Sequence, residues 1–255
     1  MKIATWNVNS LKVRLPQVLD WIAAVQPDVL CLQETKLTDE NFPAADIEAS
    51  GYQVVYSGQK TYNGVAIISK ATADDVITDV PGLDDPQRRI LGATLNGVRV
   101  LDLYVVNGQE VGSDKFAHKL HWLEQVTEHI REELNKHPRL VVLGDFNIAP
   151  EDRDVYDPEA WHERILCSTP ERTALQKILD LGMSDTFRLF EQDDQSYSWW
   201  DYRAAAYRRN RGLRIGLILA SPALTEACLS CRIDREPRGL ERPSDHTPVI
   251  AEFSL

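Results

Sequence analysis

The sequence predicts an α/β (α+β) fold in which two β-sheets pack together and helices cover their outer faces. Many short apolar runs have the length and composition of strands, whereas only three segments have a clear helical pattern. The alternation of these elements is too irregular for a simple doubly wound parallel sheet. Because no linker, low-complexity run or repeat divides the chain, we expect one domain over residues 1–255.

The individual elements follow from apolar runs and their flanking residues. The predicted strands cover residues 2–8, 29–32, 52–57, 64–69, 90–95, 98–106, 140–143, 213–220 and 248–253. An Asn-Gly turn at 96–97 predicts a hairpin between two of them. Helices are predicted over 16–25 and 115–136, and a third begins at the capping-box sequence STPE at 168–171 and ends at Gly182. Pro16 suits the first turn of the first helix, and residues 151–167 are predicted to form a polar loop.

The net charge of −11 restricts the partners of this chain. A uniformly acidic protein repels phosphate, so a nucleic-acid-binding function needs a local basic face and a divalent cation. No apolar run approaches the length of a membrane span, and the N-terminus enters a strand pattern directly, which leaves no room for a signal peptide. No apolar face remains unassigned to the core, so we expect a monomer.

The cysteines indicate a reducing compartment. Cys31, Cys167, Cys228 and Cys231 show no disulfide framework. The last two form a single CxxC without a second pair or a neighbouring histidine, so a zinc or redox site is the less favoured alternative. We therefore expect reduced thiols and a cytoplasmic protein.

Polar side chains follow several of the predicted strands. Asp145 and Asn147 come directly after the apolar run 140–143, where a buried strand would hold them rigidly at the edge of the sheet. Each could instead be a turn residue that bonds its own backbone. Similar residues follow other predicted strands: Asn7, Asn9, Glu34, Tyr104, Asp245 and His246. Together these carboxylates and amides form an oxygen-rich set that suits Mg²⁺ or Mn²⁺ rather than zinc.

This set of side chains predicts metal-assisted phosphodiester hydrolysis. An aspartate can activate water, and a histidine with two asparagines can stabilise charge on phosphate oxygens. The sequence has neither a P-loop nor a GxSxG motif, so neither an NTP-driven mechanism nor a hydrolase of the nucleophile-elbow type is supported.

Residues 199–214, called here the Arg-aromatic segment, are candidates for the basic face. Arginine fixes backbone phosphates, and tryptophan or tyrosine can stack on a base or fill an abasic gap. The alternative is a core aromatic cluster beside a solvated run of charge. The segment contains Trp199, Trp200, Tyr202, Tyr207, Arg203, Arg208, Arg209, Arg211 and Arg214.

With these motifs the chain closely resembles the exonuclease III family of AP endonucleases, within the DNase I-like endonuclease/exonuclease/phosphatase superfamily. The resemblance runs nearly end to end. The shared motifs are TWNVNSL at 5–11, LQETKL at 32–37, GQKTYNGVAI at 58–67, DPQRRI at 85–90, LGDFNIAPED at 143–152, SWWDYR at 198–203, NRGLRI at 210–215 and ERPSDHTPV at 241–249.

The resemblance implies a four-layer αββα sandwich and assigns roles to the candidate residues. Glu34 would be the main ligand of Mg²⁺, for which Mn²⁺ can substitute, with Asn7 and Asn9 nearby and Asp245 supporting the metal or His246. Asp145 would activate water, while Asn147, Tyr104 and His246 orient the phosphate. Trp199, Trp200 and Leu213 would form a pocket for an abasic sugar or frayed 3′ end. The composition of the Arg-aromatic segment separately predicts that Tyr202, Arg203, Arg209 and Arg211 bind DNA. The substrate would be duplex DNA with 3′ ends, 3′-blocking groups or abasic sites.

One departure from the family pattern concerns Gly216. The family carries at this position an aspartate that bonds the active-site histidine. Its loss predicts weakened cleavage, by about 10²–10⁴ in rate by analogy with hydrolytic triads, with fold, metal binding and DNA binding intact. Two alternatives to a nuclease are a catalytically silent nucleic-acid-binding regulator and a superfamily phosphatase. A smaller hypothesis is that Trp161-His162 blocks internal abasic sites while admitting a 3′ terminus, the alternative being an exposed loop histidine.

Overall fold

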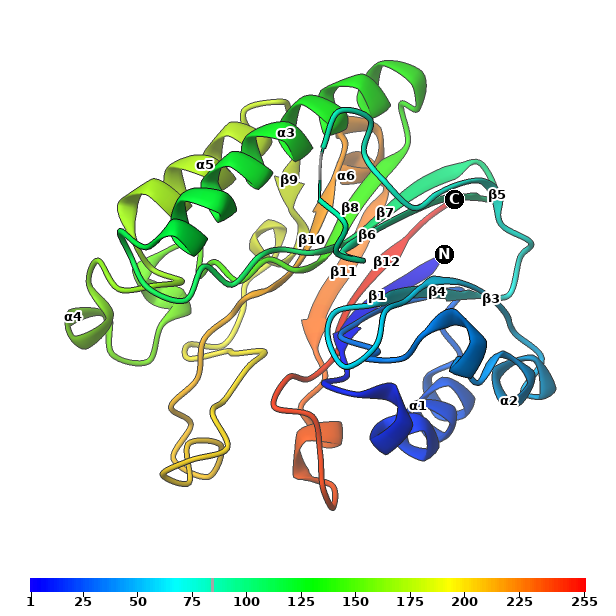
Figure 1. Cartoon of the computed structure of the whole chain (residues 1–255), viewed down its shortest axis with the longest axis horizontal. Coiled ribbons are helices and arrows are strands. Elements are labelled where there is room, and N and C mark those ends of the chain that lie inside the picture. Colours follow the sequence, from blue (N-terminus) through cyan, green and yellow to red (C-terminus); the bar gives the residue numbers. More distant parts are fainter. Residues whose placement is uncertain (84) are drawn as a thin grey trace.

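A computed structural model describes residues 1–83 and 85–255, and within them the chain forms two six-stranded sheets that pack face to face (Figure 1). The first sheet consists, in spatial order, of β11 (Cys228–Ile233), β12 (Val249–Phe253), β1 (Lys2–Asn7), β2 (Val29–Gln33), β4 (Val65–Ser69) and β3 (Gln53–Ser57). The second consists of β5 (Asp74–Ile77), β6 (Ile90–Leu95), β7 (Val98–Tyr104), β8 (Leu140–Asp145), β10 (Gly216–Ala220) and β9 (Ser184–Asp185).

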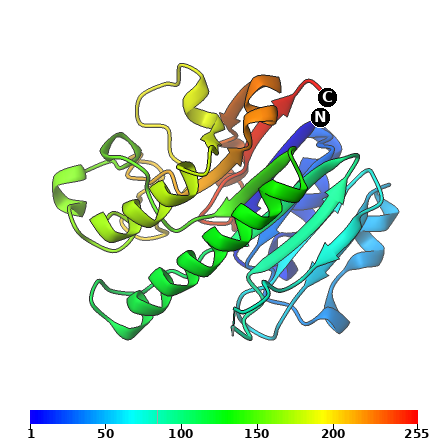
Figure 2. The same cartoon turned by 90° about the horizontal axis from the view of Figure 1, so that it is seen from above.

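Helices cover the outer face of each sheet, which completes four layers. The helices are α1 (Leu11–Val25), α2 (Ala44–Ala49), α3 (Asp114–Lys136), α4 (Pro158–Trp161), α5 (Thr169–Leu179) and α6 (Pro222–Ala227), with short 3₁₀ turns η1 (Asp39–Asn41), η2 (Asp152–Asp154), η3 (Thr186–Leu189) and η4 (Glu236–Gly239). Ile22 of α1 and Ile47 of α2 pack on the first sheet, and Trp122 of α3 and Ile178 of α5 pack on the second. Figure 2 shows α3 and α5 lying across that second sheet.

The inner faces of the two sheets share one core. Ile3 and Cys31 of the first sheet pack against Leu143 and Ile218 of the second, and all four are at most 1 % exposed. The predicted α/β class and αββα architecture are therefore confirmed.

The strand pairing brings polar residues to one end of both sheets. In the first sheet β1 and β2 run parallel with Asn7 opposite Gln33, so Glu34 follows directly. In the second, β7 and β8 run parallel with Tyr104 opposite Asp145. Because the carboxyl ends of parallel strands leave a sheet at the same edge, each sheet contributes side chains to a shared site.

Several element boundaries differ from the sequence prediction. Helix α1 begins at Leu11, so Pro16 lies inside it rather than in its first turn. Strand β10 begins only at Gly216, because Leu213 instead forms isolated bridges to Val155 and Trp199. The elements α2, α4, α6, β5, β9 and β11 were not predicted, since most are short and several are polar. The predicted hairpin is confirmed: Asn96 and Gly97 both have positive φ, as a tight turn between twisted strands requires.

Among the described residues, no helix is both long and apolar enough to traverse a bilayer. The four cysteines are all free, as expected.

Candidate active site

Three ionisable side chains from three parts of the chain meet between the two sheets. Ligand atoms of Glu34, Asp145 and His246 all lie within 4.8 Å of one another. The side-chain amide of Asn7 donates to Glu34 Oε1 (2.9 Å) and to Asp145 Oδ2 (2.8 Å). Asn7 thus joins an acid that follows the first sheet to an acid at the end of the second, which fixes their separation.

Glu34 is held in an unusual backbone conformation beside a lysine. Its φ of +53° is left-handed, which for a residue other than glycine stores strain and often marks a functional position. Lys36 Nζ lies 3.0 Å from Glu34 Oε2 and 2.5 Å from the side-chain oxygen of Asn9. Our sequence reasoning missed Lys36, although its position two residues after Glu34, in the motif LQETKL, was the available signal.

Asp145 is almost completely buried, at 2 % exposure. Burial raises the pKa of its carboxyl, although His246 and the hydrogen bond from Asn7 oppose that rise. Oδ1 accepts from the backbone N–H of Asn147 (3.0 Å), and Oδ2 lies 3.7 Å from His246 Nε2. A rigidly held carboxylate with a raised pKa is suited to accept a proton.

Asn147 stands beside Asp145 with its backbone also left-handed, at φ +48°. Its side-chain N–H donates to the carbonyl of Val105 (2.9 Å), and its side-chain oxygen accepts from Asn107 (3.3 Å). These bonds orient the amide from the side of β7.

Tyr104 completes this side of the site. Burial raises the pKa of its hydroxyl well above the usual value, and the carboxylates of Glu34 and Asp145 add to this while Arg89 opposes it. The Arg89 guanidinium lies 4.6 Å from the centre of the ring. Tyr104 therefore keeps its proton and can donate a hydrogen bond.

Asp245 lies outside the group formed by Glu34, Asp145 and His246. Its Oδ1 accepts from Asn9 (3.0 Å) and its Oδ2 accepts from the indole N–H of Trp199 (3.0 Å). Its observed contacts tie the loop after β1 to the Arg-aromatic segment. The ring of Trp199 lies 6.5 Å from that of His246, between centroids.

Gly216 begins β10 directly opposite Asp145. A Cβ added to Gly216 would meet Val249 Cγ2 at 3.3 Å and Ser198 Oγ at 3.4 Å. Within the described residues, the acid that faces the imidazole of His246 is Asp145.

The Arg-aromatic segment is partly core and partly surface. Trp200 and Leu213 are both fully buried, and the DNA contacts expected of their side chains stay a prediction. The indole of Trp200 donates to Asn210 (3.1 Å) and packs edge-on against Tyr207. In this conformation Trp200 and Leu213 both belong to buried hydrophobic clusters.

The arginines of the segment divide in the same way. The residues Arg203, Arg208, Arg209 and Arg211 are exposed. Arg214 instead is buried and paired with Asp154 and Asp185, so it anchors the base of the segment.

Tyr202 is 50 % exposed and links three loops. Its hydroxyl donates to the carbonyl of Pro243 (2.8 Å) and accepts from Arg14 (2.9 Å), whose other amino group bonds the carbonyl of Asn9 (2.9 Å). Sequence reasoning missed Arg14, because a helix arginine gives no sign of such long-range contacts.

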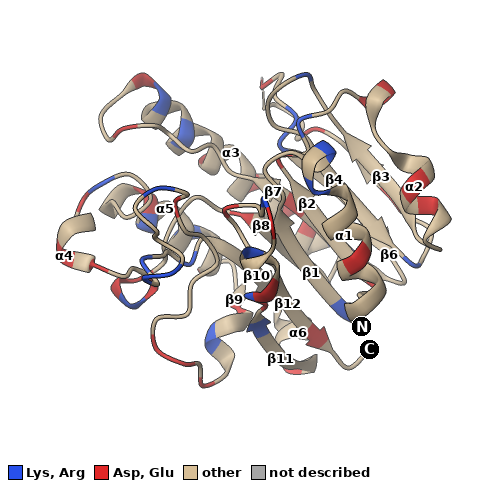
Figure 3. Cartoon of the chain, turned by 90° about the horizontal axis from the view of Figure 1, so that it is seen from below, with Lys and Arg blue, Asp and Glu red and all other residues tan. Residues whose placement is uncertain are grey.

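Basic and acidic residues both occur on this side of the molecule (Figure 3). The figure shows basic and acidic segments interspersed near α4 and α5, a basic segment at one end of α1, and acidic residues on α2. A cavity of about 790 Å³ beside the site is lined by Lys12, Lys36 and Lys60, among other residues.

His162 is exposed and follows α4.

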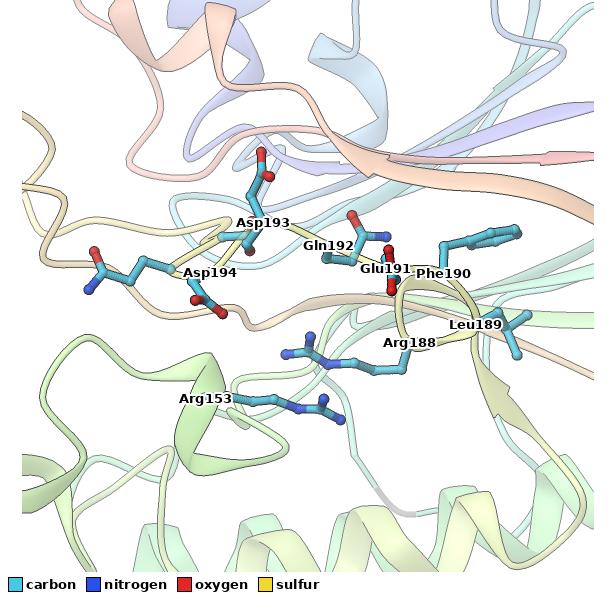
Figure 4. A pocket seen from close by; sticks show the side chains of 10 residues that line it. Arg153, Arg188, Leu189, Phe190, Glu191, Gln192, Asp193 and Asp194 are labelled. Carbon is cyan, nitrogen blue, oxygen red and sulfur yellow. Dashed lines mark hydrogen bonds between the residues drawn. The ribbon is translucent and has the colours of Figure 1, made fainter.

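A second cavity, of about 590 Å³, lies apart from the predicted site (Figure 4). Figure 4 shows Arg153 and Arg188 extending beside each other near the acidic loop 191–194. Arg188 pairs with the buried Asp154 and Arg153 pairs with Glu151, so both guanidinium groups already have carboxylate partners. None of the predicted site residues lines this cavity.

The fold and the site together define a class of protein. An αββα sandwich with two carboxylates, a histidine and asparagine amides at one end of its sheets fits a metal-dependent phosphoesterase. Residues 4–246 match the model of the endonuclease/exonuclease/phosphatase family.

Comparisons with individual proteins narrow this class. The chain is 35 % identical to exodeoxyribonuclease III of Haemophilus influenzae over 99 % of this chain and 100 % of that one. Among solved structures, the 3′-5′ exonuclease NExo of Neisseria meningitidis is 54 % identical to this chain, with a TM-score of 0.98. An AP endonuclease of Archaeoglobus fulgidus is 39 % identical, with a TM-score of 0.96. Each comparison covers 100 % of both chains. The chain belongs to the exodeoxyribonuclease III branch of the endonuclease/exonuclease/phosphatase family.

Proposed function

We propose that this protein is a DNA repair nuclease that hydrolyses phosphodiesters of duplex DNA at 3′ ends, 3′-blocking groups or abasic sites. The observation that carries this proposal is the convergence of Glu34, Asp145 and His246, with Asn7 bonded to both acids. Relatives in the family are named as 3′-5′ exonuclease, 3′ phosphatase and AP endonuclease.

The donor set at the site fits a divalent cation, and we propose Mg²⁺, with Mn²⁺ as a substitute. Glu34 and Asp145 offer carboxylate oxygens and Asn9 an amide oxygen, which are hard ligands. The ammonium of Lys36 already bonds Glu34 and Asn9, so these oxygens attract positive charge. A bound cation there supplies positive charge against the phosphate oxygens.

The residues of the chain would then divide the remaining work. Asp145 accepts the proton of the attacking water, whose oxygen bonds to phosphorus while the ester bond breaks. The leaving oxygen departs with its part of the DNA and takes up a proton from solvent water. Asn147 and Tyr104 donate hydrogen bonds to the phosphate oxygens, and His246, in the segment before β12, contacts the same phosphate group. Burial of Asp145 and Asn147 keeps these groups fixed before the substrate binds.

Local positive charge resolves the difficulty raised by a net charge of −11. The exposed arginines of the Arg-aromatic segment and the lysine-lined cavity beside Lys36 provide contacts for DNA phosphates on two sides of the site. Trp199, which is half-buried and lies next to His246, is the aromatic residue best placed to contact a nucleotide.

Gly216 supports two further proposals. We expect cleavage to be weaker than in relatives that carry the aspartate, because His246 lacks a second carboxylate to orient it. A catalytically silent DNA-binding regulator is the alternative function that this glycine favours. The retained group of Glu34, Asp145 and His246 argues against silence.

Incubation with 3′-recessed duplex DNA tests the proposed function. Cleavage that requires Mg²⁺, stops in EDTA and disappears in Asp145→Asn supports a nuclease. Mg²⁺-independent binding without cleavage supports the regulator, and release of phosphate only from small phosphate esters supports a phosphatase.

Three further expectations concern organisation and location. A shared inter-sheet core supports one domain over residues 1–255. Four free cysteines support a reducing cytoplasm. The chain is expected to act as a monomer, which sedimentation can test.

A further inference from the structure

A buried ion pair lies behind Asn147, and the mechanism above gives it no role. Lys119 of α3 and Glu171 of α5 form a salt bridge, and both side chains are 0 % exposed. Removing two charges from water is expensive, and well-packed apolar side chains often stabilise such a position equally well. The pair therefore calls for an explanation beyond joining α3 to α5.

The hydrogen bonds of the Lys119 ammonium explain why the pair is buried here. Lys119 Nζ donates to the backbone carbonyl of Asn147 (2.7 Å) and to the backbone carbonyl of Asn107 (3.1 Å), and its third partner is Glu171. The side chains of Asn107 and Asn147 are themselves hydrogen-bonded. Lys119 thus binds the backbone carbonyls of Asn107 and Asn147, while the side-chain amides of these two residues bond each other.

Glu171 is fixed in turn by the start of its own helix. Its Oε2 accepts from the backbone N–H (3.1 Å) and the hydroxyl (2.6 Å) of Ser168, and its Oε1 accepts from the backbone N–H of Leu166 (3.1 Å). The predicted capping box is therefore present, and its glutamate, Glu171, also forms the salt bridge with Lys119. Glu171 therefore presents a fixed carboxylate to the ammonium of Lys119.

The chain beside Lys119 is shaped to admit it. Gly108 has a φ of +86°, and a Cβ there would lie 3.0 Å from Lys119 Cδ. On the other side Asn147 has its left-handed backbone, while Phe146 and Ile148 next to it are fully buried. A strained residue between two core anchors needs a partner for its inward carbonyl, and the ammonium provides it.

We propose that Lys119, oriented by Glu171, is a positioning residue that fixes the backbone of Asn147 so that its amide faces the scissile phosphate. This inference rests on the proposed nuclease function, in which Asn147 contacts the phosphate. An apolar pair could fill the same volume, but it could not donate to the carbonyls of Asn147 and Asn107.

The test compares two buried ion pairs. Lys119→Met combined with Glu171→Leu removes the pair without leaving an unpaired charge. The control, Arg99→Met with Glu133→Leu, removes a buried pair (Nε–Oε2 2.5 Å) that joins the start of β7 to α3. Among the described residues, the Arg99 guanidinium bonds Glu133, Asp75 and Thr94 rather than Asn147. For each protein, Tm, kcat and KM are measured on 3′-recessed duplex DNA in saturating Mg²⁺.

We expect the Lys119/Glu171 variant to lose about 10–100-fold in kcat with KM within about threefold, because displacing a catalytic group by about 1 Å has an effect of this size. The control should keep kcat within about threefold of wild type. The inference is wrong if kcat is unchanged in the first variant, or if both variants lose kcat equally.

A double-mutant cycle keeps the inference testable if the combined variant folds poorly. Lys119→Met should reduce kcat strongly in the wild-type background but by less than about threefold in Asn147→Ala, because it acts through Asn147. Independent, multiplying losses would contradict it. If wild-type protein shows no cleavage, the proposed nuclease function is wrong, but the positioning role of Lys119 can still be tested by hydrogen exchange. Lys119→Met should accelerate exchange at the backbone N–H of Asn147, and unchanged exchange would refute the positioning role.

Discussion

Replacing Gly216 with aspartate introduces the carboxylate that the resemblance to the exonuclease III family implies at this position, and the structure indicates that it can be accommodated. The backbone of Gly216 does not have a positive φ, so a side chain introduces no left-handed strain there. Its Cβ would meet Val249 Cγ2 at 3.3 Å and Ser198 Oγ at 3.4 Å, which requires shifts of a few tenths of an ångström. Overpacking of this kind destabilises by about 1–3 kcal/mol, which lowers Tm by a few degrees.

The expected gain in rate follows from what an orienting carboxylate contributes. Gly216 N–H bonds Ser198 Oγ (2.9 Å), and the N–H of Thr247, next to His246, bonds Ser198 O (2.9 Å). The new carboxylate would therefore lie on the strand beside the segment that carries the imidazole. By analogy with hydrolytic triads, Gly216→Asp should raise kcat by about 10²-fold, with an upper bound of about 10⁴-fold.

Single-turnover cleavage of a 3′-recessed duplex in Mg²⁺ measures this gain. Gly216→Asn is the matched control, because it has nearly the same volume without the charge, and it should raise the rate by less than about threefold. If Gly216→Asp folds, judged by Tm, and its rate does not exceed that of Gly216→Asn, the orienting role is refuted.

Three other predictions address the segment around the site, the neighbouring loop and a buried acid. Trp200→Ala should destabilise the protein by about 3–5 kcal/mol in chemical denaturation, because the side chain is fully buried. Trp199→Ala should mainly weaken DNA binding, by about 1–3 kcal/mol, because its indole stacks on a base. Equal effects of the two substitutions on stability would contradict this division. His162→Gly should raise cleavage at an internal abasic site relative to a recessed 3′ end, and an unchanged ratio would leave the histidine as a loop residue. Burial raises the pKa of Asp102 well above its usual value, so the folded protein keeps a proton that the unfolded chain releases above about pH 4. The free energy of unfolding should therefore fall as the pH rises from about 4 toward the raised pKa of the folded state, and Asp102→Asn should remove this pH dependence.

The sequence predicts the framework of this protein because its strands are apolar runs between clear breakers. The run 140–143 and the Asn-Gly turn at 96–97 both give the observed elements. Short polar elements escape detection: β5, with the sequence DDVI, is mostly exposed and has no apolar face to detect. Pro16 was misplaced because proline favours a first turn, yet here the preceding turn of α1 forms as well.

The chemistry of the site was visible in residue types, but its contacts were not. Glu34 and Asp145 stand out as acids after buried strands, whereas the bridge made by Asn7 depends on how two sheets stack. Burial within a mixed segment was equally hidden, since nothing in the sequence separates the core residue Trp200 from its half-buried neighbour Trp199. The helical pattern of α3 likewise favours burial of Leu120, but the structure buries Lys119 completely because Glu171 and two carbonyls satisfy its ammonium.

Calorimetric titration of Mn²⁺ into the protein, with a bound duplex that ends at the site and resists cleavage, measures the central claim most directly. The account predicts that wild-type protein binds Mn²⁺ there and that Glu34→Gln weakens this binding by at least about tenfold, while Glu48→Gln, at an exposed position of α2, leaves it unchanged. Equal affinity in wild type and Glu34→Gln would mean that the cation binds elsewhere, and the assignment of the site would be wrong.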